Sequence, residues 1–538
     1  MEIAYTWIAM LLSMALVGVL ARRVSIPYPI LLVAAGLAIG LVPWFHPPPL
    51  NPDLILFFFL PVLVYREAFE TSWRDFNRWL TTILMLSVGL VAATIVGVAF
   101  VAKWSLPDMP WSVAFVLGAI VSPTDTVAAS AVLHRIHVPR RLSAILGGES
   151  LVNDATGLVA LQLAIGVVAS GAFDWLNVSR AFLWTVIGGV AVGLIVGYLA
   201  HEANRRIRDT TVLFTLSLVA PSFAFVAAHM LHASGVLAVL TVGFWVSWRF
   251  HAVKAHTRYD LYAVWRLMAY VVDGLCFLLI GLEIPRLVQS VESERLPDFL
   301  LAGGLVTLAV IVIRILFMFP SAHIPLRLSA KLREREGEIP AAKHLFLGAW
   351  CGMRGAVSLA AALAVPLLIN AKPFPCRDEL LICTFCVIIG TLVVQGLTLH
   401  PLIRWMGISG DAHAGEEERL ARISMMQAAL SRLDQIKAET QVDPAAIDHV
   451  EATYMERLRL LISAPSPVRR CHELTDKSGS LFAVEFETLL SERSRLLDLR
   501  DSGDINDLTH IRLQEELDMI EMRAMAHTKP TAGKTASH

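Results

Sequence analysis

The sequence predicts an all-α protein that crosses a membrane many times and ends in a charged helical tail. Of its 538 residues, 56% are hydrophobic and only 17% are charged, and the mean hydropathy is +0.61. Apolar runs recur from the N-terminus to about residue 402, separated by short polar loops, which is the pattern of a polytopic membrane protein. The formal net charge of −1 gives no reason to expect nucleic acid as a partner.

The apolar runs indicate thirteen transmembrane spans. Most approach the roughly 20 helical residues that cross a hydrocarbon core of about 30 Å. The first run is followed, not preceded, by Arg22 and Arg23, the reverse of a cleavable signal peptide, so we expect it to remain as a helix. The spans are expected at residues 3–21, 28–44, 52–66, 79–102, 110–132, 141–169, 181–201, 211–230, 234–249, 262–283, 299–319, 344–369 and 379–402.

The distribution of Lys and Arg between alternate loops supports this count and sets an orientation. The first, third, fifth and later odd-numbered loops together contain nineteen Lys and Arg residues, whereas the even-numbered loops contain six. Cytoplasmic loops are enriched in Lys and Arg. We therefore expect the N-terminus outside and the C-terminus in the cytoplasm, because a missed or extra span would remove the asymmetry.

An odd number of spans allows spans 1–6 and 8–13 to be inverted repeats, with span 7 as the linker. Such repeats place a substrate site at mid-membrane, on discontinuous helices at matching positions. The fifth span of each repeat has a polar interruption: Ser122-Pro-Thr-Asp-Thr126 in the first and Cys351-Gly-Met-Arg-Gly355 in the second. Kinks that serve packing alone are the alternative, but packing does not require Asp125 or Arg354. We therefore predict two crossed discontinuous helices.

The composition changes after residue 402. We expect residues 1–402 to form the transmembrane domain and residues 403–538 a helical cytoplasmic tail, a candidate regulatory domain. Charged residues become frequent from Glu416 onward, and apolar residues recur between them at helical spacing. The recurring residues are Leu420, Ile423, Met426, Leu430 and Leu433.

The sixth span carries a cluster of polar side chains in an otherwise apolar run. A charged group at mid-bilayer costs about 2.5–3.5 kcal/mol on insertion scales, so it is usually retained to handle ions or protons. Glu149 and Asn153 are four residues apart, as are Ser150 and Asp154, so the four lie on two adjacent helix faces. Oxygen ligands of this kind suit a hard monovalent cation. A backbone opened at Thr124 would add free carbonyl groups.

Asp154 is the group that we expect to exchange a cation for a proton. Burial disfavours the charged form of a carboxylate, so a proton and a cation compete for it. Each side of the membrane would replace one by the other, while the empty charged form is too costly to cross. A structurally paired aspartate is the alternative interpretation.

Five other intramembrane charges admit more than one role. Glu149 can pair with Arg354, which cannot deprotonate and needs a counter-charge, or it can bind the ion directly; we favour the pair. Asp125 can compensate the half-helix dipoles or lie beside the ion. Asp273 and Arg314 can pair with each other, which we favour, or belong to the ion path.

Other energy sources and cofactors have no signal in the sequence. It contains no GxxxxGKS or GxxxxGKT phosphate loop and no Asp-Lys-Thr-Gly phosphorylation motif. Cys383 and Cys386 have CxxC spacing, but they lie in an apolar span without a second pair, which does not indicate a metal or redox site. We therefore expect a gradient-driven secondary transporter, not an enzyme, with no cofactor.

Three motifs follow one another along the sequence: Ser122-Pro-Thr-Asp125, Gly148-Glu-Ser-Leu-Val-Asn-Asp154 and Gly352-Met-Arg-Gly-Ala-Val-Ser-Leu359. In this order they resemble the motifs of the monovalent cation:proton antiporter-1 family, which includes bacterial NhaP-type and animal NHE-type exchangers. The resemblance implies a homodimer in which an ion-carrying domain moves like an elevator. It implies that Asp154 carries Na⁺ or H⁺, that Asn153, Ser150, Thr124 and Glu149 support the site, and that Arg354 braces it.

Asn153 stands where the resemblance separates two kinds of exchanger. Members with Asn before the key Asp generally exchange one cation for one proton, whereas relatives with Asp-Asp are electrogenic. The resemblance thus implies electroneutral Na⁺/H⁺ exchange in a bacterial inner membrane, serving pH homeostasis, with Asp154, Ser150 and Thr124 as ligands of the transported Na⁺. Exchange of K⁺ or Li⁺ on the same scaffold is the near alternative, and a cation channel or sensor the distant one.

Overall fold

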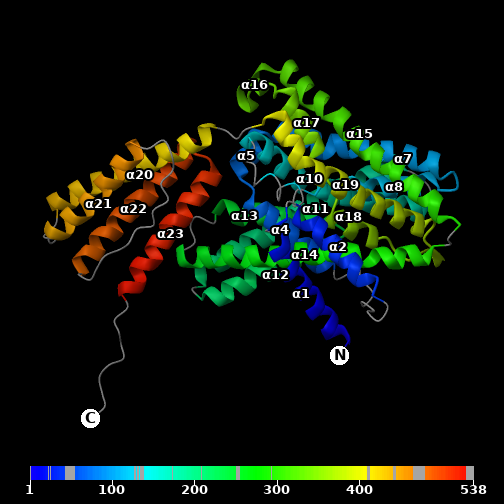
Figure 1. The fold of residues 1–538 in the computed structure, drawn as a ribbon, viewed down its shortest axis with the longest axis horizontal. Coiled ribbons are helices and arrows are strands. Elements are labelled where there is room, and N and C mark those ends of the chain that lie inside the picture. Colours follow the sequence, from blue (N-terminus) through cyan, green and yellow to red (C-terminus); the bar gives the residue numbers. More distant parts are fainter. Residues whose placement is uncertain are drawn as a thin grey trace, which may run out of the picture. The chain divides into compact units, whose positions relative to one another are not determined.

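The protein is built almost entirely from helices (Figure 1). Its computed structural model forms two compact units: Met1–Phe250 with Val264–Gly410, and His251–Ala263 with Asp411–His538. The residues that the structure describes are 2–21, 23–24, 26–42, 55–125, 129, 133, 139–171, 174–207, 209–249, 255–291, 294–408, 412–439, 444–463 and 479–528.

The first unit holds the apolar helices. Among the described residues, seven helical stretches are long and apolar enough to cross a membrane, and shorter apolar helices accompany them. This is a multi-pass membrane architecture, whereas the count of thirteen spans and the inverted repeats stay predictions. The elements are α1 (Glu2–Ala21), α2 (Tyr28–Gly40), the π-helical η1 (Ile55–Phe59), α4 (Leu60–Glu70), α5 (Trp73–Arg78), α6 (Leu80–Leu84), the π-helical η2 (Met85–Leu90), α7 (Val91–Ser105), α8 (Trp111–Val121), α10 (Arg140–Ser170), α11 (Trp175–Arg206), α12 (Thr210–Met230), α13 (Gly235–Arg249), α14 (Ala255–Ser290), α15 (Leu296–Leu328), α16 (Ala330–Glu336), α17 (Ala342–Trp350), α18 (Ala356–Leu363), the short strands β1 (Leu368–Ile369) and β2 (Lys372–Pro373), and α19 (Arg377–Met406).

Helical structure is interrupted at both predicted positions. The first break (Ser122–Asp125) follows the end of α8, and the second break (Cys351–Gly355) separates α17 from α18. Thr126, which the sequence assigns to the first interruption, lies outside the described residues. In a bilayer the backbone groups released by such breaks need new partners, because no lipid group replaces them.

The two breaks supply partners to each other. The Asp125 N–H donates to the carbonyl of Met353 at 2.8 Å, and the Ala356 N–H donates to Asp125 Oδ2 at 3.2 Å. The Asp125 carboxylate thus lies at the N-terminus of α18, where the helix dipole favours negative charge. Of the two roles that the sequence allowed for Asp125, this contact provides the compensation of a half-helix dipole. The approach is close enough that a Cβ at Gly355 would lie 1.7 Å from Asp125 Oδ2.

The second unit contains the tail helices α20 (Ala412–Glu439), α21 (Pro444–Ser463), α22 (Gly479–Ser502) and α23 (Asp507–Thr528). Apolar side chains from these helices form two buried clusters, which include Leu433 and Leu513. The N-terminal end of α14 belongs to the same unit. There Arg258 is buried and its Nη2 lies 2.6 Å from Asp518 Oδ1 on α23. α19 continues to Met406, past the boundary at residue 402 that the sequence suggests.

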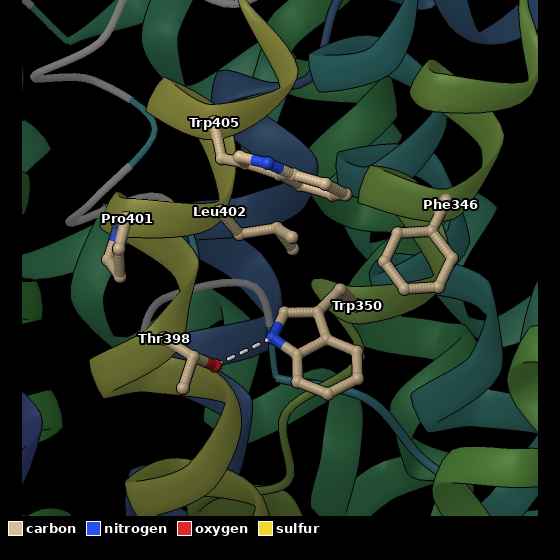
Figure 2. Close-up of a pocket in the computed structure, with 6 residues that line it drawn as sticks. All are labelled: Phe346, Trp350, Thr398, Pro401, Leu402 and Trp405. Carbon is tan, nitrogen blue, oxygen red and sulfur yellow. Dashed lines mark hydrogen bonds between the residues drawn. The ribbon is translucent and has the colours of Figure 1, made fainter.

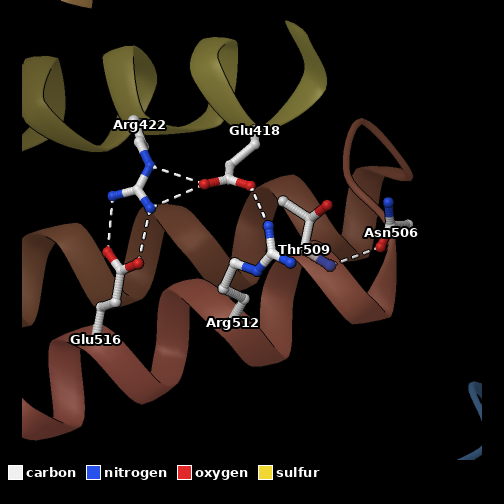
Figure 3. A network of polar contacts seen from close by, with 6 residues as sticks. All are labelled: Glu418, Arg422, Asn506, Thr509, Arg512 and Glu516. Carbon is white, nitrogen blue, oxygen red and sulfur yellow. Dashed lines mark hydrogen bonds and ion pairs between the residues drawn. The ribbon is translucent and has the colours of Figure 1, made fainter. Parts of the chain in front are cut away.

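A polar network joins the first and last tail helices (Figure 3). Glu418 on α20 accepts hydrogen bonds from Arg422 at 2.9 Å and from Arg512 at 2.8 Å. Arg422 also donates to both carboxylate oxygens of Glu516 on α23, at 2.7 and 2.8 Å. Bidentate contacts of this kind fix geometry more than single surface ion pairs do. They therefore set how α20 and α23 align.

We predict that Gly355→Ala disrupts the crossing of the two breaks. The added Cβ would overlap the Asp125 carboxylate, and overpacking of this kind commonly costs about 1–3 kcal/mol or more. The variant should show a lower apparent melting temperature than the unmodified protein in detergent, measured by the loss of monodisperse protein on heating. Gly166→Ala on α10 is the matched control, because a Cβ there meets nothing within 4 Å. Equal melting of the two variants would contradict the described crossing.

Candidate functional site

Asp154 on α10 lies at the centre of the predicted site. It is 3% exposed, and its Oδ1 has no hydrogen-bond partner among the described residues. The carboxylates of Glu67 and Asp125 and the guanidinium of Arg354 are close enough to act on it electrostatically. Asp154 is therefore a buried carboxylate with an unused oxygen, surrounded by charges of both signs.

Two side chains of α10 hold the first break against this carboxylate. Ser150 Oγ donates to the carbonyl of Thr124 at 2.9 Å, and Asn153 Nδ2 donates to the Thr124 hydroxyl at 2.6 Å. All three residues are buried. Gly157, one turn further along, allows the close approach, because a Cβ there would lie 2.6 Å from Pro123 Cγ. The structure thus brings together the cluster on α10 and the opened backbone, as the sequence predicts.

Glu67 is a neighbour of the site that the sequence analysis missed. The predicted third span ends at residue 66, which assigns Glu67 to a loop, whereas α4 continues to Glu70. Glu67 is half-buried and acts electrostatically on Asp154. The sequence feature that could have identified it is an acidic residue one position beyond the expected end of the third span, because the ends of helices are the least certain part of such an assignment.

Glu149 pairs with Arg314, so the predicted Glu149–Arg354 pair is wrong. Arg314 Nη2 donates to Glu149 Oε2 at 2.9 Å and Nη1 donates to Oε1, and both side chains are 1% exposed. The same guanidinium donates to the carbonyls of Ala349 at 3.0 Å and Gly348 at 3.2 Å. These carbonyls end α17, where the broken helix leaves acceptors without intrahelical partners. Arg314 satisfies them, which Arg354, beyond the helix end, does not.

Asp273 pairs with Arg66, so the predicted Asp273–Arg314 pair is wrong as well. Arg66 Nη1 lies 3.0 Å from Asp273 Oδ2, and the pair joins α4 to α14. The Asp273 side chain is 10% exposed and that of Arg66 is 27% exposed. Arg66 is the last residue of the expected third span and is also one of the nineteen basic residues counted with the loops, a position that did not indicate a partner at membrane depth.

Arg354 lies fully buried in the second break. Its backbone N–H donates to the Thr391 hydroxyl on α19 at 3.0 Å. None of its three guanidinium nitrogens has a hydrogen-bond partner within the described part of the chain. Glu149, Asp154 and Arg314 act on it electrostatically. Arg354 is therefore a positive charge near Asp154 that no described carboxylate neutralises through an ion pair.

The donor set at the site is made of oxygen atoms. Within one turn of Asp154 on α10, Ser150 and Asn153 bind the carbonyl and hydroxyl oxygens of Thr124 at the first break. The carboxylates of Glu67 on α4 and Asp125 at the first break act on Asp154 electrostatically. Such ligands bind hard cations, and carboxylates also accept protons. Among the residues that the structure describes, no three His, Cys, Asp or Glu side chains cluster to hold a resident metal ion. The oxygen atoms of these residues are therefore candidate ligands for a cation, and the carboxylates are candidate proton acceptors.

Comparisons with known proteins identify the family of the chain. A family model described as "Sodium/hydrogen exchanger, transmembrane" matches residues 10–405. An uncharacterized Na⁺/H⁺ exchanger of Mycobacterium bovis is 33% identical over 525 residues, covering 96% of each chain. A sodium, potassium, lithium and rubidium/H⁺ antiporter of Bacillus subtilis is 26% identical, covering 97% of this chain and 78% of its own length.

The fold is also found among solved structures. The sodium proton antiporter MjNhaP1 from Methanocaldococcus jannaschii matches with a TM-score of 0.60 at 20% identity, over 76% of this chain and 99% of that chain. The resemblance that the three motifs indicated is confirmed by these matches. The chain belongs to the sodium/hydrogen exchanger family, whose members are secondary transporters of monovalent cations and protons.

Proposed function

We propose that the protein exchanges Na⁺ for H⁺ across the membrane, one for one, with Asp154 as the group that binds either ion. The observation that carries this proposal is the buried Asp154 carboxylate with an unused oxygen, one turn along α10 from Ser150, which binds the opened backbone at Thr124. Asp154, the Ser150 hydroxyl and Thr124 supply ligands for the cation. Ser150 donates its hydrogen to Thr124, so its oxygen lone pairs remain available as acceptors.

Competition between the two ions follows from the electrostatics around Asp154. Glu67 and Asp125 place negative charge beside it, and burial already disfavours the ionised form. A bound cation or a bound proton relieves both the repulsion from these carboxylates and the cost of burying the ionised form. The positive charge of Arg354 acts in the opposite direction by favouring the ionised form of Asp154. The carboxylate therefore remains able to release its proton to a cation. Glu67 and Asp125 join the site as charges that act on Asp154.

The polar contacts support an elevator-type movement. Ser150 links α10 to the first break, Asp125 links the first break to α18, and Arg314 links α15 to both α10 and α17. These elements would move as one body that carries the ion. A homodimer is part of the same proposal, as is an orientation with the N-terminus outside and the tail in the cytoplasm, where the tail would regulate transport.

Exchange of K⁺ is the second candidate on the same scaffold. The Bacillus subtilis relative is named for sodium, potassium, lithium and rubidium, so a relative of this chain is named for monovalent cations of several sizes. Cation preference is therefore measured directly, with each ion tested in turn.

Replacement of the central carboxylate provides the first test. Asp154→Asn should abolish proton movement driven by Na⁺ in proteoliposomes, because an amide carries neither the proton nor the negative charge. The measurement is the change of internal pH after Na⁺, K⁺ or Li⁺ is added outside. Asp298→Asn, an exposed carboxylate on α15, is the control and should transport normally. Exchange that persists in Asp154→Asn would refute the mechanism, and flux without saturation or a counter-gradient would indicate a channel.

The stoichiometry has a separate test. One-for-one exchange moves no net charge, so the initial rate should not change when a K⁺/valinomycin potential of either sign is imposed across vesicles. Na⁺ is the transported ion in this assay, which keeps the K⁺ gradient separate from the substrate. A rate that follows the imposed potential would rule out electroneutral exchange and leave the antiport itself standing.

The roles of Glu149 and Arg314 can be separated with a double-mutant cycle. Glu149→Gln alone leaves Arg314 buried without its counter-charge, which commonly costs about 3–5 kcal/mol, and should sharply lower thermal stability. The double variant Glu149→Gln with Arg314→Gln removes both charges and should recover part of the stability and part of the Na⁺/H⁺ exchange, although the carbonyls of Gly348 and Ala349 lose the guanidinium donors. Recovery of stability without any exchange would show instead that Glu149 binds the ion directly.

A further inference from the structure

An apolar groove lies between α17 and α19, away from the residues assigned to ion exchange (Figure 2). Its volume is about 330 Å³, within the roughly 300–1,000 Å³ range of small-molecule pockets. Trp405 bounds one end of it and Trp350 the other, and Leu402 lies between them. The lining residues are Phe346, Trp350, Thr398, Pro401, Leu402 and Trp405.

The polar groups in this groove are already paired. Trp350 Nε1 donates to the Thr398 hydroxyl at 2.9 Å, and Thr398 donates in turn to the carbonyl of Val394 at 2.5 Å. The ring of Trp350 stacks on Phe346 with centroids 5.9 Å apart. The wall thus offers aromatic and aliphatic surface without an open hydrogen-bonding group. Such a surface fits a hydrocarbon chain better than a peptide, whose backbone would need partners.

Basic residues lie at one end of the groove. α17 and α19 run antiparallel along the groove: Trp350 contacts Thr398, whereas Phe346, earlier on α17, lies toward Trp405, later on α19 (Figure 2). Lys343, Phe346 and Trp350 are spaced to share one helix face. Lys343 and Arg404 are both exposed, and they lie in the terminal turns of their helices. Two positive side chains therefore lie at the end of the groove where α17 begins and α19 ends.

The position along α19 matches the interface of a bilayer. Thr398 to Met406 spans about 12 Å at 1.5 Å per residue, and α19 ends at Met406. Exposed Trp side chains at helix ends are typical of the headgroup level, and Trp405 is 84% exposed. An occupant of the groove would have its apolar part beside Trp350 and its polar end beside Lys343 and Arg404.

We propose that this groove binds an anionic phospholipid, with one acyl chain between α17 and α19 and the headgroup phosphate at Lys343 and Arg404. Charge complementarity selects an anionic over a zwitterionic headgroup, because positive side chains near a membrane surface attract anionic lipid. The site goes beyond the proposed antiport and needs only that α17 and α19 lie in the membrane. It touches the half-helix α17, whose last carbonyls Arg314 binds.

The test measures lipid binding to the full-length protein directly. Purified protein in neutral detergent is titrated with dioleoylphosphatidylglycerol or with dioleoylphosphatidylcholine, and bound lipid is counted by native mass spectrometry. Each basic residue near the headgroup is expected to contribute about fivefold in affinity. Lys343→Gln with Arg404→Gln should therefore lose roughly 25-fold in phosphatidylglycerol binding and little in phosphatidylcholine binding.

A second variant tests the apolar half of the site. Leu402→Trp fills the groove and should weaken both lipids at least about fivefold. Arg180→Gln, an exposed charge on α11, is the control and should bind both lipids as the unmodified protein does. Melting temperature and gel-filtration profile establish that each variant is folded. If the double charge variant does not fold, Lys343→Gln and Arg404→Gln are tested singly, each with about a fivefold loss expected.

Three outcomes would overturn the proposal. They are equal affinity of the unmodified protein for the two lipids, unchanged phosphatidylglycerol binding in the charge variants, and unchanged binding in Leu402→Trp. A protein that copurifies in place of lipid and is lost from Leu402→Trp would assign the groove to a protein partner and also overturn it. Binding is measured without transport, so the result does not depend on whether the protein exchanges Na⁺.

Discussion

The membrane part of this protein is governed by the need to satisfy backbone groups where its helices break. Hydrocarbon offers no hydrogen bonds, so each freed N–H and C=O must find a partner within the protein. Asp125, Thr391 and Arg314 meet this need at the second break and at the end of α17. Ser150 meets it at the first break. The polar residues around the ion site are therefore structural partners of the backbone as well as candidate ligands.

This constraint also assigns roles to the two buried arginines near the candidate ion site, Arg314 and Arg354. Arg314 faces the carbonyls at the end of α17, and a guanidinium there has donors left for a carboxylate. Glu149 completes that arrangement and is fully used by it. Arg354, beyond the helix end, is left to act on Asp154 without an ion pair among the described residues. Because Glu149 pairs with Arg314, the charge of Arg354 acts on Asp154 instead.

The sequence predicted the helical breaks, the cluster on α10 and the contact between them, because each depends on local patterns of polar residues in apolar runs. It did not predict which charges pair. The paired charges come from four different helices: Arg66, Glu149, Asp273 and Arg314. Which of them pair depends on how these helices rotate and cross, and local sequence patterns do not determine that packing. Glu67 was missed for a different reason, since hydropathy locates the centre of a span better than its end.

The Glu149–Arg314 pair also explains why the site keeps two acidic residues less than two turns apart on one helix. A buried ion pair gives little net stability, because desolvation of both charges offsets their attraction. Its value here is geometric: it fixes α15 against α10 and α17 at the depth of the site. With Glu149 held in this way, Asp154 is the carboxylate on α10 whose oxygen is unused among the described residues. One helix therefore carries both a carboxylate held in an ion pair and a carboxylate with an unused oxygen.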